Sequence, residues 1–331
     1  MKKILFLVFL ACYATAGAQQ QFALLGDFRT TGGSPVKDCK IGYRILGRLN
    51  AEKSNAVLWP TWFGGTSGEL VGGAIPGTLD TAGLCVIAVD ALGNGVSSSP
   101  SNTPDFPDIT VRDMVNSEYE LLTKHLKISH LRAVMGVSMG GMQTYEWLVA
   151  HPDFMDKAVP IVGSPKLSFF DLLLWRTEAD IIEKAGSSPA AKASAMEEVL
   201  EVHLMHLETP AYWVRTEKPE NFEARLAREI ARAKTLDADN WLCQLRAMMG
   251  HDIYASSGKS ADDLKNVVKA RVLVIAAKQD HMVNPASSVA FARALGCDLY
   301  EPDNDCGHIP GMCEGAVIRA LVSGWVKSQS P

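Results

Sequence analysis

The sequence predicts an α/β fold, in which a mostly parallel central sheet is flanked by helices and carries an inserted helical cap. Short apolar runs rich in Val, Ile and Leu recur along the chain, as is typical of strands buried on both faces of a parallel sheet. Segments with apolar residues at helical spacing separate these runs. Residues 165–260 contain helical patterns alone, which predicts an insertion between two parts of the sheet domain.

Local patterns define each element in turn. The expected strands are 21–29, 39–48, 55–59, 84–90, 131–135, 158–162 and 272–277. The expected helices are 110–126, 142–149, 170–183, 191–206, 221–234, 240–249 and 318–325. Thr110 followed by Asp113 indicates a capping box at the start of the first helix. We divide the chain into an export signal, the first part of the sheet domain, the helical cap and the second part of the sheet domain, which cover 1–18, 19–164, 165–260 and 261–331.

One serine lies between glycines at a predicted strand-to-helix turn. Residues 136–141 are Gly-Val-Ser-Met-Gly-Gly, directly after the apolar run 131–135 and before a segment with helical spacing. A serine on so sharp a turn has a strained backbone, needs neighbours without a Cβ, and presents its hydroxyl in the open. Free N–H groups at the start of the helix would face any negative charge formed there. Ser138 is therefore the candidate nucleophile.

Two further side chains supply the partners that a serine nucleophile requires. Asp280 follows the apolar run 272–277 at the carboxyl end of a predicted strand, where open α/β sheets place their sites. His308 lies next to a glycine, in a loop ahead of the last predicted helix. The chain order serine, acid, histidine is that of the α/β-hydrolase fold. We therefore expect His308 to take the proton of Ser138 and Asp280 to orient the imidazole.

Such chemistry passes through an acyl-enzyme and needs backbone N–H donors for the oxyanion. One donor is expected from Met139, the residue after the serine. The second is expected from the loop after the strand 55–59, most directly from Phe63, with Trp62 as the neighbouring alternative. Trp62 is also a candidate for contact with the substrate. The alternative is that both aromatic side chains belong to the core.

Several stretches of the chain resemble the homoserine O-acetyltransferase family of the α/β-hydrolase fold. They are 38–43 (Asp-Cys-Lys-Ile-Gly-Tyr), 55–58, 90–95 (Asp-Ala-Leu-Gly-Asn-Gly), 136–143 and 239–242 (Asp-Asn-Trp-Leu). The serine segment is the most specific of these, and the resemblance covers nearly all of the chain after residue 18. It implies the α/β-hydrolase fold, acyl transfer, and a catalytic triad of Ser138, Asp280 and His308.

Two positions depart from the family's pattern. In members that act on homoserine, an aspartate follows the catalytic histidine and binds the amino group of the substrate, whereas this chain has Ile309. An ammonium left unpaired against an apolar side chain would cost several kcal/mol. The family's arginine for the substrate carboxylate has only Arg176 as a counterpart, out of register. We therefore expect Ile309 to contact an uncharged substrate.

The N-terminal segment predicts export. Lys2 and Lys3 precede an apolar run over 4–11 and an Ala-Gly-Ala cleavage signal at 16–18. The run is shorter than the roughly 20 residues of a membrane-spanning helix, so no stable membrane insertion is expected. We expect a periplasmic or secreted protein. A lipoprotein attached through Cys12 is the alternative.

Charge and cysteine content limit the possible partners of the protein and indicate whether it can form disulfides. The chain has 32 Lys and Arg against 37 Asp and Glu and no long basic run, so no nucleic-acid partner is expected. No cysteine or histidine spacing indicates a metal site, and no cofactor is expected. Cleavage after residue 18 leaves six of the seven cysteines, an even number that permits disulfides. A bridge between Cys306 and Cys313 would restrain the His308 loop; the alternative is that all six are free.

Three functions are compatible with these residues. The first is an exported serine esterase that transfers the acyl group of a small-molecule ester to water. The second is an O-acyltransferase of the homoserine O-acetyltransferase type, which transfers the acyl group to an alcohol. The third is a non-catalytic binding protein with the same fold. The presence of a nucleophile, a base and an acid argues against this third function. A homodimer formed through the cap is left open.

Overall fold

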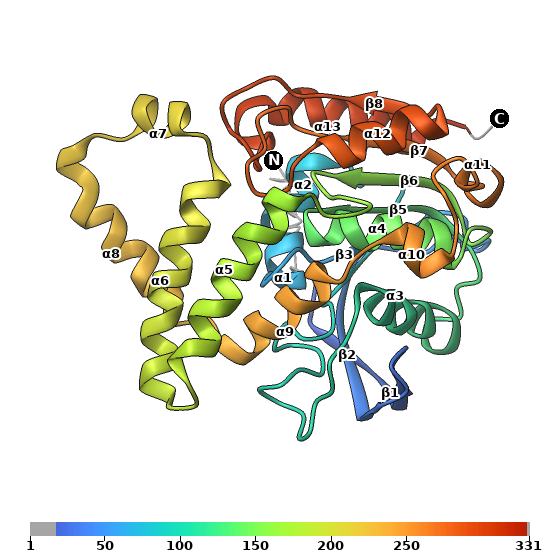
Figure 1. Ribbon diagram of the computed structural model, residues 1–331. Helices are drawn as coiled ribbons and strands as arrows, with labels where there is room; N and C mark the ends of the chain where they lie inside the picture. The colour runs from blue at the N-terminus through green and yellow to red at the C-terminus, as the bar shows by residue number, and fades with distance from the viewer. Residues whose placement is uncertain (1–17, 330–331) are drawn as a thin grey trace, which may run out of the picture.

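The computed structural model describes residues 18–329, whose centre is an eight-stranded sheet (Figure 1). Its strands are β1 (Gln21–Arg29), β2 (Pro35–Gly47), β3 (Ala56–Pro60), β4 (Cys85–Val89), β5 (Leu131–Val137), β6 (Met155–Ile161), β7 (Arg271–Ile275) and β8 (Asp298–Tyr300). They lie in the order β1-β2-β4-β3-β5-β6-β7-β8. The pairs of β2 with β1 and β4 are antiparallel, and all other pairs are parallel. The expected mostly parallel sheet is confirmed.

Helices connect the strands and cover both faces of the sheet. Those of the sheet domain are α1 (Ser67–Glu69), α2 (Ile75–Thr78), α3 (Val111–Glu120), α4 (Met139–Ala150), α10 (Ile253–Ser257), α11 (Leu264–Val267), α12 (Ala286–Leu295) and α13 (Gly311–Lys327). Two π-helical turns, η1 (Leu70–Ala74) and η2 (Leu121–His125), continue α1 and α3. Helix α3 begins with the expected capping box between Thr110 and Asp113.

The sheet is buried on both faces because its central strands alternate between two apolar clusters. All five residues of β3 are buried. Ala56 and Leu58 pack in one cluster with α3, α4 and α12, whereas Val57 and Trp59 pack in the other with α2 and α13. This alternation is what a strand between two helical layers requires. The carboxyl ends of β3, β5 and β7 thereby open at one edge of the sheet.

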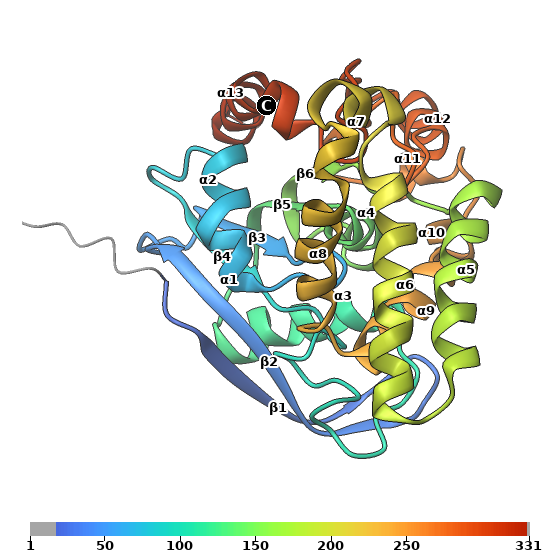
Figure 2. The same ribbon diagram turned by 90° about the vertical axis from the view of Figure 1, so that its left-hand side faces the viewer.

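The cap lies between β6 and β7 and consists of helices alone. It contains α5 (Phe169–Ala185), α6 (Pro189–Leu207), α7 (Pro210–Thr216), the single turn η3 (Pro219–Asn221), α8 (Phe222–Ala233) and α9 (Ala238–Met249). Figure 1 shows α5, α6 and α8 beside the sheet domain, and Figure 2 looks onto this layer. Helix α6 packs against both α5 and α8, and α9 packs against α5.

Several boundaries differ from those expected from the sequence. β2 begins at Pro35 instead of residue 39, and β6 spans Met155–Ile161 instead of 158–162. Helix α7 was not expected, because a proline usually interrupts a helical pattern. Here Pro210 is instead the first residue of a new helix, and Thr209 caps it.

The export signal, except for residue 18, and Cys12 lie outside the described residues. Within residues 18–329, no helix combines the length and the apolar character needed to cross a bilayer.

Candidate active site

Ser138 lies on a turn that only its glycine neighbours permit. It follows β5 as the N-cap residue of α4, with φ 59° and ψ −122°, a conformation that a residue with a side chain rarely adopts. A Cβ on Gly136 would lie 2.4 Å from the carbonyl carbon of Gly140, and a Cβ on Gly140 would lie 2.7 Å from the carbonyl oxygen of Pro60. The two glycines therefore allow strand, turn and helix to pack closely enough to hold the serine in this conformation.

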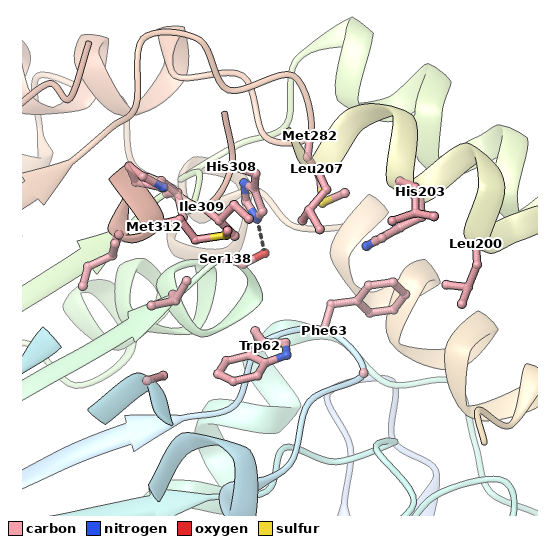
Figure 3. Close-up of a pocket in the computed structure, with 18 of the residues that line it drawn as sticks. Trp62, Phe63, Ser138, Leu200, His203, Leu207, Met282, His308, Ile309 and Met312 are labelled. Atoms are coloured by element: carbon pink, nitrogen blue, oxygen red, sulfur yellow. Dashed lines mark hydrogen bonds between the residues drawn. The ribbon is translucent and has the colours of Figure 1, made fainter. Parts of the chain in front are cut away.

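Ser138, His308 and Asp280 form a continuous line of hydrogen bonds. The serine Oγ is 2.8 Å from Nε2 of His308 (Figure 3), and Nδ1 of His308 is 2.7 Å from Oδ2 of Asp280. The other carboxylate oxygen of Asp280 accepts the N–H groups of Met282 and Val283, each at 2.9 Å. A carboxylate held this way accepts a hydrogen bond from the Nδ1–H group, which leaves Nε2 of a neutral ring to accept the serine proton.

The two backbone N–H groups expected to bind an oxyanion belong to Met139 and Phe63. Met139 is the first residue of α4, so its N–H has no partner within the helix. Phe63 lies in the loop after β3. The side-chain amide of Gln143 donates to a carbonyl of that loop at 3.0 Å, and Oε1 of Gln244 in the cap accepts the N–H of Gly64 at 2.9 Å. The loop is therefore fixed from both sides.

A cavity of about 470 Å³ opens above Ser138, between the sheet domain and the cap (Figure 3). Trp62 and Ile309 line it, as expected from the sequence. From the cap, the lining includes Trp175, Leu200, His203, Leu204, Leu207, Leu236 and Trp241. The lining is largely apolar, so the cavity favours uncharged groups of a ligand. Arg176, in contrast, is an exposed residue that pairs with Asp180 and does not line the cavity.

Helix α5 of the cap holds the loop that carries Asp280. Oδ1 of Asp171 accepts the N–H of Asn284 at 2.8 Å, and the indole N–H of Trp175 donates to the carbonyl oxygen of Met282 at 3.2 Å. Asp171 is buried, and this burial raises the pKa of its carboxyl above the ordinary value. The acid loop is thus attached to the cap at two points.

The loop that carries His308 is attached to the cap in the same way. The N–H of His308 donates to the carbonyl oxygen of Leu207, at the end of α6, at 2.9 Å. The hydroxyl of Thr209 donates to the carbonyl oxygen of Asp305 at 2.7 Å. The guanidinium of Arg215 binds both carboxylate oxygens of Asp305, at 2.7 and 2.8 Å. A bidentate pair of this kind fixes direction as well as distance.

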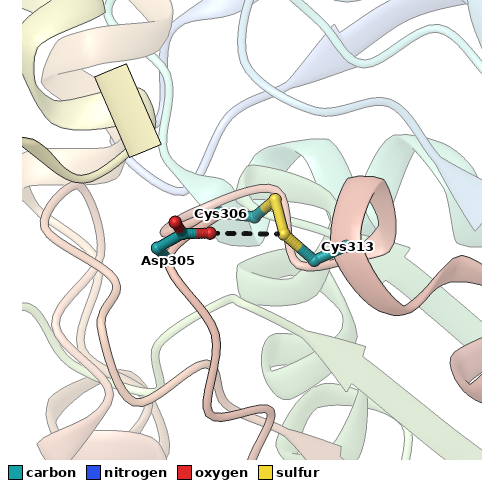
Figure 4. A group of neighbouring side chains, drawn as sticks. All are labelled: Asp305, Cys306 and Cys313. Carbon is teal, nitrogen blue, oxygen red and sulfur yellow. Dashed lines mark hydrogen bonds between the residues drawn. A yellow bond between two sulfur atoms is a disulfide. The ribbon is translucent and has the colours of Figure 1, made fainter. Parts of the chain in front are cut away.

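A disulfide closes the same loop. Cys306 and Cys313 are bridged (Figure 4), so the pairing considered from the sequence is present and the alternative that all six cysteines are free is wrong. Sγ of Cys313 lies 3.6 Å from a carboxylate oxygen of Asp305. Although these three residues lie close enough to surround an ion, both sulfurs are used in the bridge and neither is a thiolate ligand. Cys39, Cys85, Cys243 and Cys297 are free.

Two residues of the site were not identified from the sequence. His203 on α6 lines the cavity, and its Nδ1 is 3.1 Å from a carboxylate oxygen of Glu178 on α5. The two are 25 positions apart in the sequence and meet only when the cap helices pack. Val162, after β6, also lines the cavity and has φ 42°, a strained value for a β-branched residue. No spacing or motif in the sequence indicates either feature.

Comparison with known proteins agrees with the fold described above. Residues 58–185 match the alpha/beta hydrolase fold family. The chain is 39% identical over 177 residues to the ethyl acetate hydrolase of Pseudomonas veronii, covering 51% of this chain and 50% of that protein. It is 27% identical over 369 aligned positions to the homoserine O-acetyltransferase of Methanococcoides burtonii, covering 92% and 72%. The solved structure of an acetylester hydrolase from Corynebacterium glutamicum has a TM-score of 0.85 and 24% identity, covering 94% and 96%.

Fold and relatives together identify this chain as a protein of the α/β-hydrolase fold that is similar to acyl hydrolases and acyltransferases. Within that fold, it resembles the homoserine O-acetyltransferases and the esterases similar to them, which confirms the resemblance inferred from the sequence. The chain spans about half the length of the first curated relatives it matches, with 50% and 53% of those proteins covered.

The disulfide is expected to support both stability and the position of His308. Replacing Cys306 and Cys313 together by serine should lower the free energy of unfolding by about 2 kcal/mol, because a short closed loop is released. Turnover of an ester should fall severalfold, while the contacts of Asp305 with the cap retain part of the geometry. Denaturant unfolding and steady-state kinetics measure the two effects. Cys297→Ser, at a free cysteine, is the control, and equal turnover in both variants would contradict this role.

Proposed function

We propose that this protein is an exported serine esterase that hydrolyses small, uncharged esters, with acetyl esters as the first class to test. The observation that carries the proposal is the line of hydrogen bonds from Ser138 through His308 to Asp280, at 2.8 and 2.7 Å, beneath an apolar cavity. The names of the similar ethyl acetate hydrolase and acetylester hydrolase support the choice of acetyl esters.

The reaction follows from the positions of these groups. The Oγ of Ser138 attacks the ester carbonyl while Nε2 of His308 takes its proton, and the resulting imidazolium is stabilised by Asp280. The oxyanion is bound by the N–H groups of Met139 and Phe63. His308 then gives its proton to the leaving alcohol, and an acyl-enzyme remains. Water then attacks the acyl carbon while Nε2 of His308 takes its proton. The bond between the acyl carbon and Oγ breaks, His308 returns the proton to Oγ, and the acid is released.

The apolar lining supports uncharged substrates over amino acids. Ile309 stands next to the proposed base and offers no carboxylate to an ammonium. Arg176 is paired with Asp180 outside the cavity and offers nothing to a substrate carboxylate. A zwitterionic acceptor such as homoserine would therefore find no charged partner at these two positions. The charged residues of the lining are Glu229 and Arg232 of α8, and Glu229 is paired with Arg225 at 3.0 Å.

Acyl transfer to an alcohol other than homoserine is the second candidate function. It is supported by the similarity to homoserine O-acetyltransferases, which extends over 92% of this chain in one alignment. Hydrolysis and transfer share the acyl-enzyme and differ only in the group that attacks it. The ratio of free acid to acylated alcohol, measured with one acyl donor and a series of alcohols, separates the two.

Export of the protein is part of the proposal. The basic and apolar N-terminal residues with their small-residue cleavage signal support it. The disulfide between Cys306 and Cys313 supports it too, because such bridges persist in oxidising compartments outside the cytoplasm. Detection of the mature chain in the periplasmic or culture fraction, with its N-terminus sequenced, tests this part directly.

Substitution of the proposed nucleophile tests the catalytic role of Ser138. Ser138→Ala should lower kcat for an aryl acetate by at least about 10⁴-fold, because no other hydroxyl replaces the attacking group. His308→Gln should have a comparable effect, and Asp280→Asn should leave a small residual rate through a misoriented ring. Circular dichroism and the thermal midpoint check that each variant is folded.

The matched control is Ser187→Ala, at an exposed serine in the turn between α5 and α6. It should retain wild-type turnover. If Ser138→Ala turns over the aryl acetate at the wild-type rate, the assignment of the nucleophile is wrong.

A separate prediction concerns the acceptor of the acyl group. With acetyl-CoA and homoserine, acetyl transfer should be slow and should not saturate at modest homoserine concentration, because Ile309 offers no carboxylate to the ammonium beside the proposed base. A short-chain aryl acetate should be hydrolysed with a much higher kcat/KM. Steady-state kinetics of the two reactions on one preparation give the comparison. Acetylation of homoserine that outpaces ester hydrolysis would contradict the proposal and favour the biosynthetic reaction of the relatives.

A further inference from the structure

His203 is a polar group in the cap part of the cavity, where the lining also includes Glu229 and Arg232 of α8. It extends from α6, among leucines 200, 204 and 207 of the same helix, all of which line the cavity. Figure 3 shows its ring next to Phe63 and across the cavity from Ser138. The ring centroids of His203 and Phe63 are 6.1 Å apart.

A buried carboxylate orients this ring. Glu178 on α5 is 1% exposed. One of its oxygens lies 3.1 Å from Nδ1 of His203, and the other accepts the indole N–H of Trp241 at 3.2 Å. Both oxygens therefore accept hydrogen bonds from other cap helices. The edge of the ring is further fixed by Trp241, whose centroid is 5.2 Å from that of His203.

The hydrogen bond to Glu178 determines whether Nε2 of His203 donates or accepts a hydrogen bond in the cavity. Because Nδ1–H donates to the carboxylate, Nε2 of the neutral ring carries a lone pair and accepts hydrogen bonds. Among residues 18–329, no protein group pairs with Nε2 of His203, and this atom is not among the fully buried ones. His203 thus offers the cavity a hydrogen-bond acceptor of fixed direction.

We propose that His203 binds a hydroxyl group on the alcohol part of the substrate, remote from the scissile bond. The inference rests on the proposed esterase function and names its substrate class as acetyl esters of diols or polyols. An acetyl group ends one carbon from the ester carbonyl, so a group that reaches from Ser138 to the opposite wall belongs to the alcohol. Glu178 is the positioning residue that keeps Nε2 an acceptor.

The experiment compares kcat/KM for monoacetates of linear diols of increasing length with the alkyl acetates in which a methyl group replaces the distal hydroxyl. At the length that reaches His203, the wild-type enzyme should favour the hydroxylated ester by about tenfold. His203→Phe keeps a planar ring and removes the acceptor, so this preference should be lost or reversed. The measured quantity is the ratio of the two kcat/KM values, because a change that slows both reactions equally cancels in this ratio.

His206→Phe is the matched control. This histidine lies on the same helix, bonds to the carbonyl of Val202 and is not part of the cavity lining. Its replacement should leave the ratio unchanged. A wild-type enzyme that hydrolyses both esters without favouring the hydroxyl, or a His203→Phe variant that keeps the wild-type ratio, would overturn the inference alone. Failure to hydrolyse either ester would defeat the proposed function and this inference with it.

Glu178→Gln provides a second readout that a purely structural role would not produce. A glutamine satisfies the Trp241 indole with its oxygen and therefore donates its amide to Nδ1 of His203, which moves the ring proton to Nε2. His203 then presents a donor. Esters with a distal methoxy group, which only accept hydrogen bonds, should gain severalfold in kcat/KM relative to the alkyl acetates. An unchanged methoxy preference in a folded Glu178→Gln variant would contradict the assigned role of Glu178.

Discussion

The site depends on one constraint. Three loops at the same edge of the sheet must keep their positions relative to one another closely enough for hydrogen bonds to form between their side chains. The cap supplies that restraint. Asp171 and Trp175 of α5 bind the loop of Asp280, the end of α6 and Arg215 of α7 bind the loop before α13, and Gln244 of α9 binds the loop after β3. A helical insertion that covers the cavity therefore also sets the geometry beneath it. Movement of the cap as a whole would disturb all three loops at once.

Backbone strain is concentrated next to the loops that the cap holds. Ser138 and Val162, at the ends of the adjacent strands β5 and β6, both have positive φ values, 59° and 42°. Residues in such conformations cost on the order of 1 to 3 kcal/mol each and persist only where the surroundings determine them. Here the N–H of Ser138 donates to the carbonyl of Ile161, and that of Val162 to the carbonyl of Ile275. The parallel sheet thus stabilises the conformation that exposes the serine.

Local patterns in the sequence predict the elements on which the site is built, but not the contacts between them. The glycines around Ser138 indicated the turn because only residues without a Cβ fit there, and the chain order of serine, acid and histidine indicated the fold. Glu178 and His203 had no such signal, since their contact arises from the packing of α5 against α6. The role of Arg215 was missed for a related reason: it arises from the contact with Asp305, which lies far along the chain.

The most direct test of this account is to trap the acyl-transfer site chemically. The purified protein is treated with a fluorophosphonate, digested, and mapped by mass spectrometry, with His308→Gln treated in parallel. The account predicts one phosphonyl group per chain, located on Ser138, with loss of ester hydrolysis in proportion to labelling and little labelling of His308→Gln. An adduct on another residue, or full hydrolysis by protein whose Ser138 is modified, would contradict it.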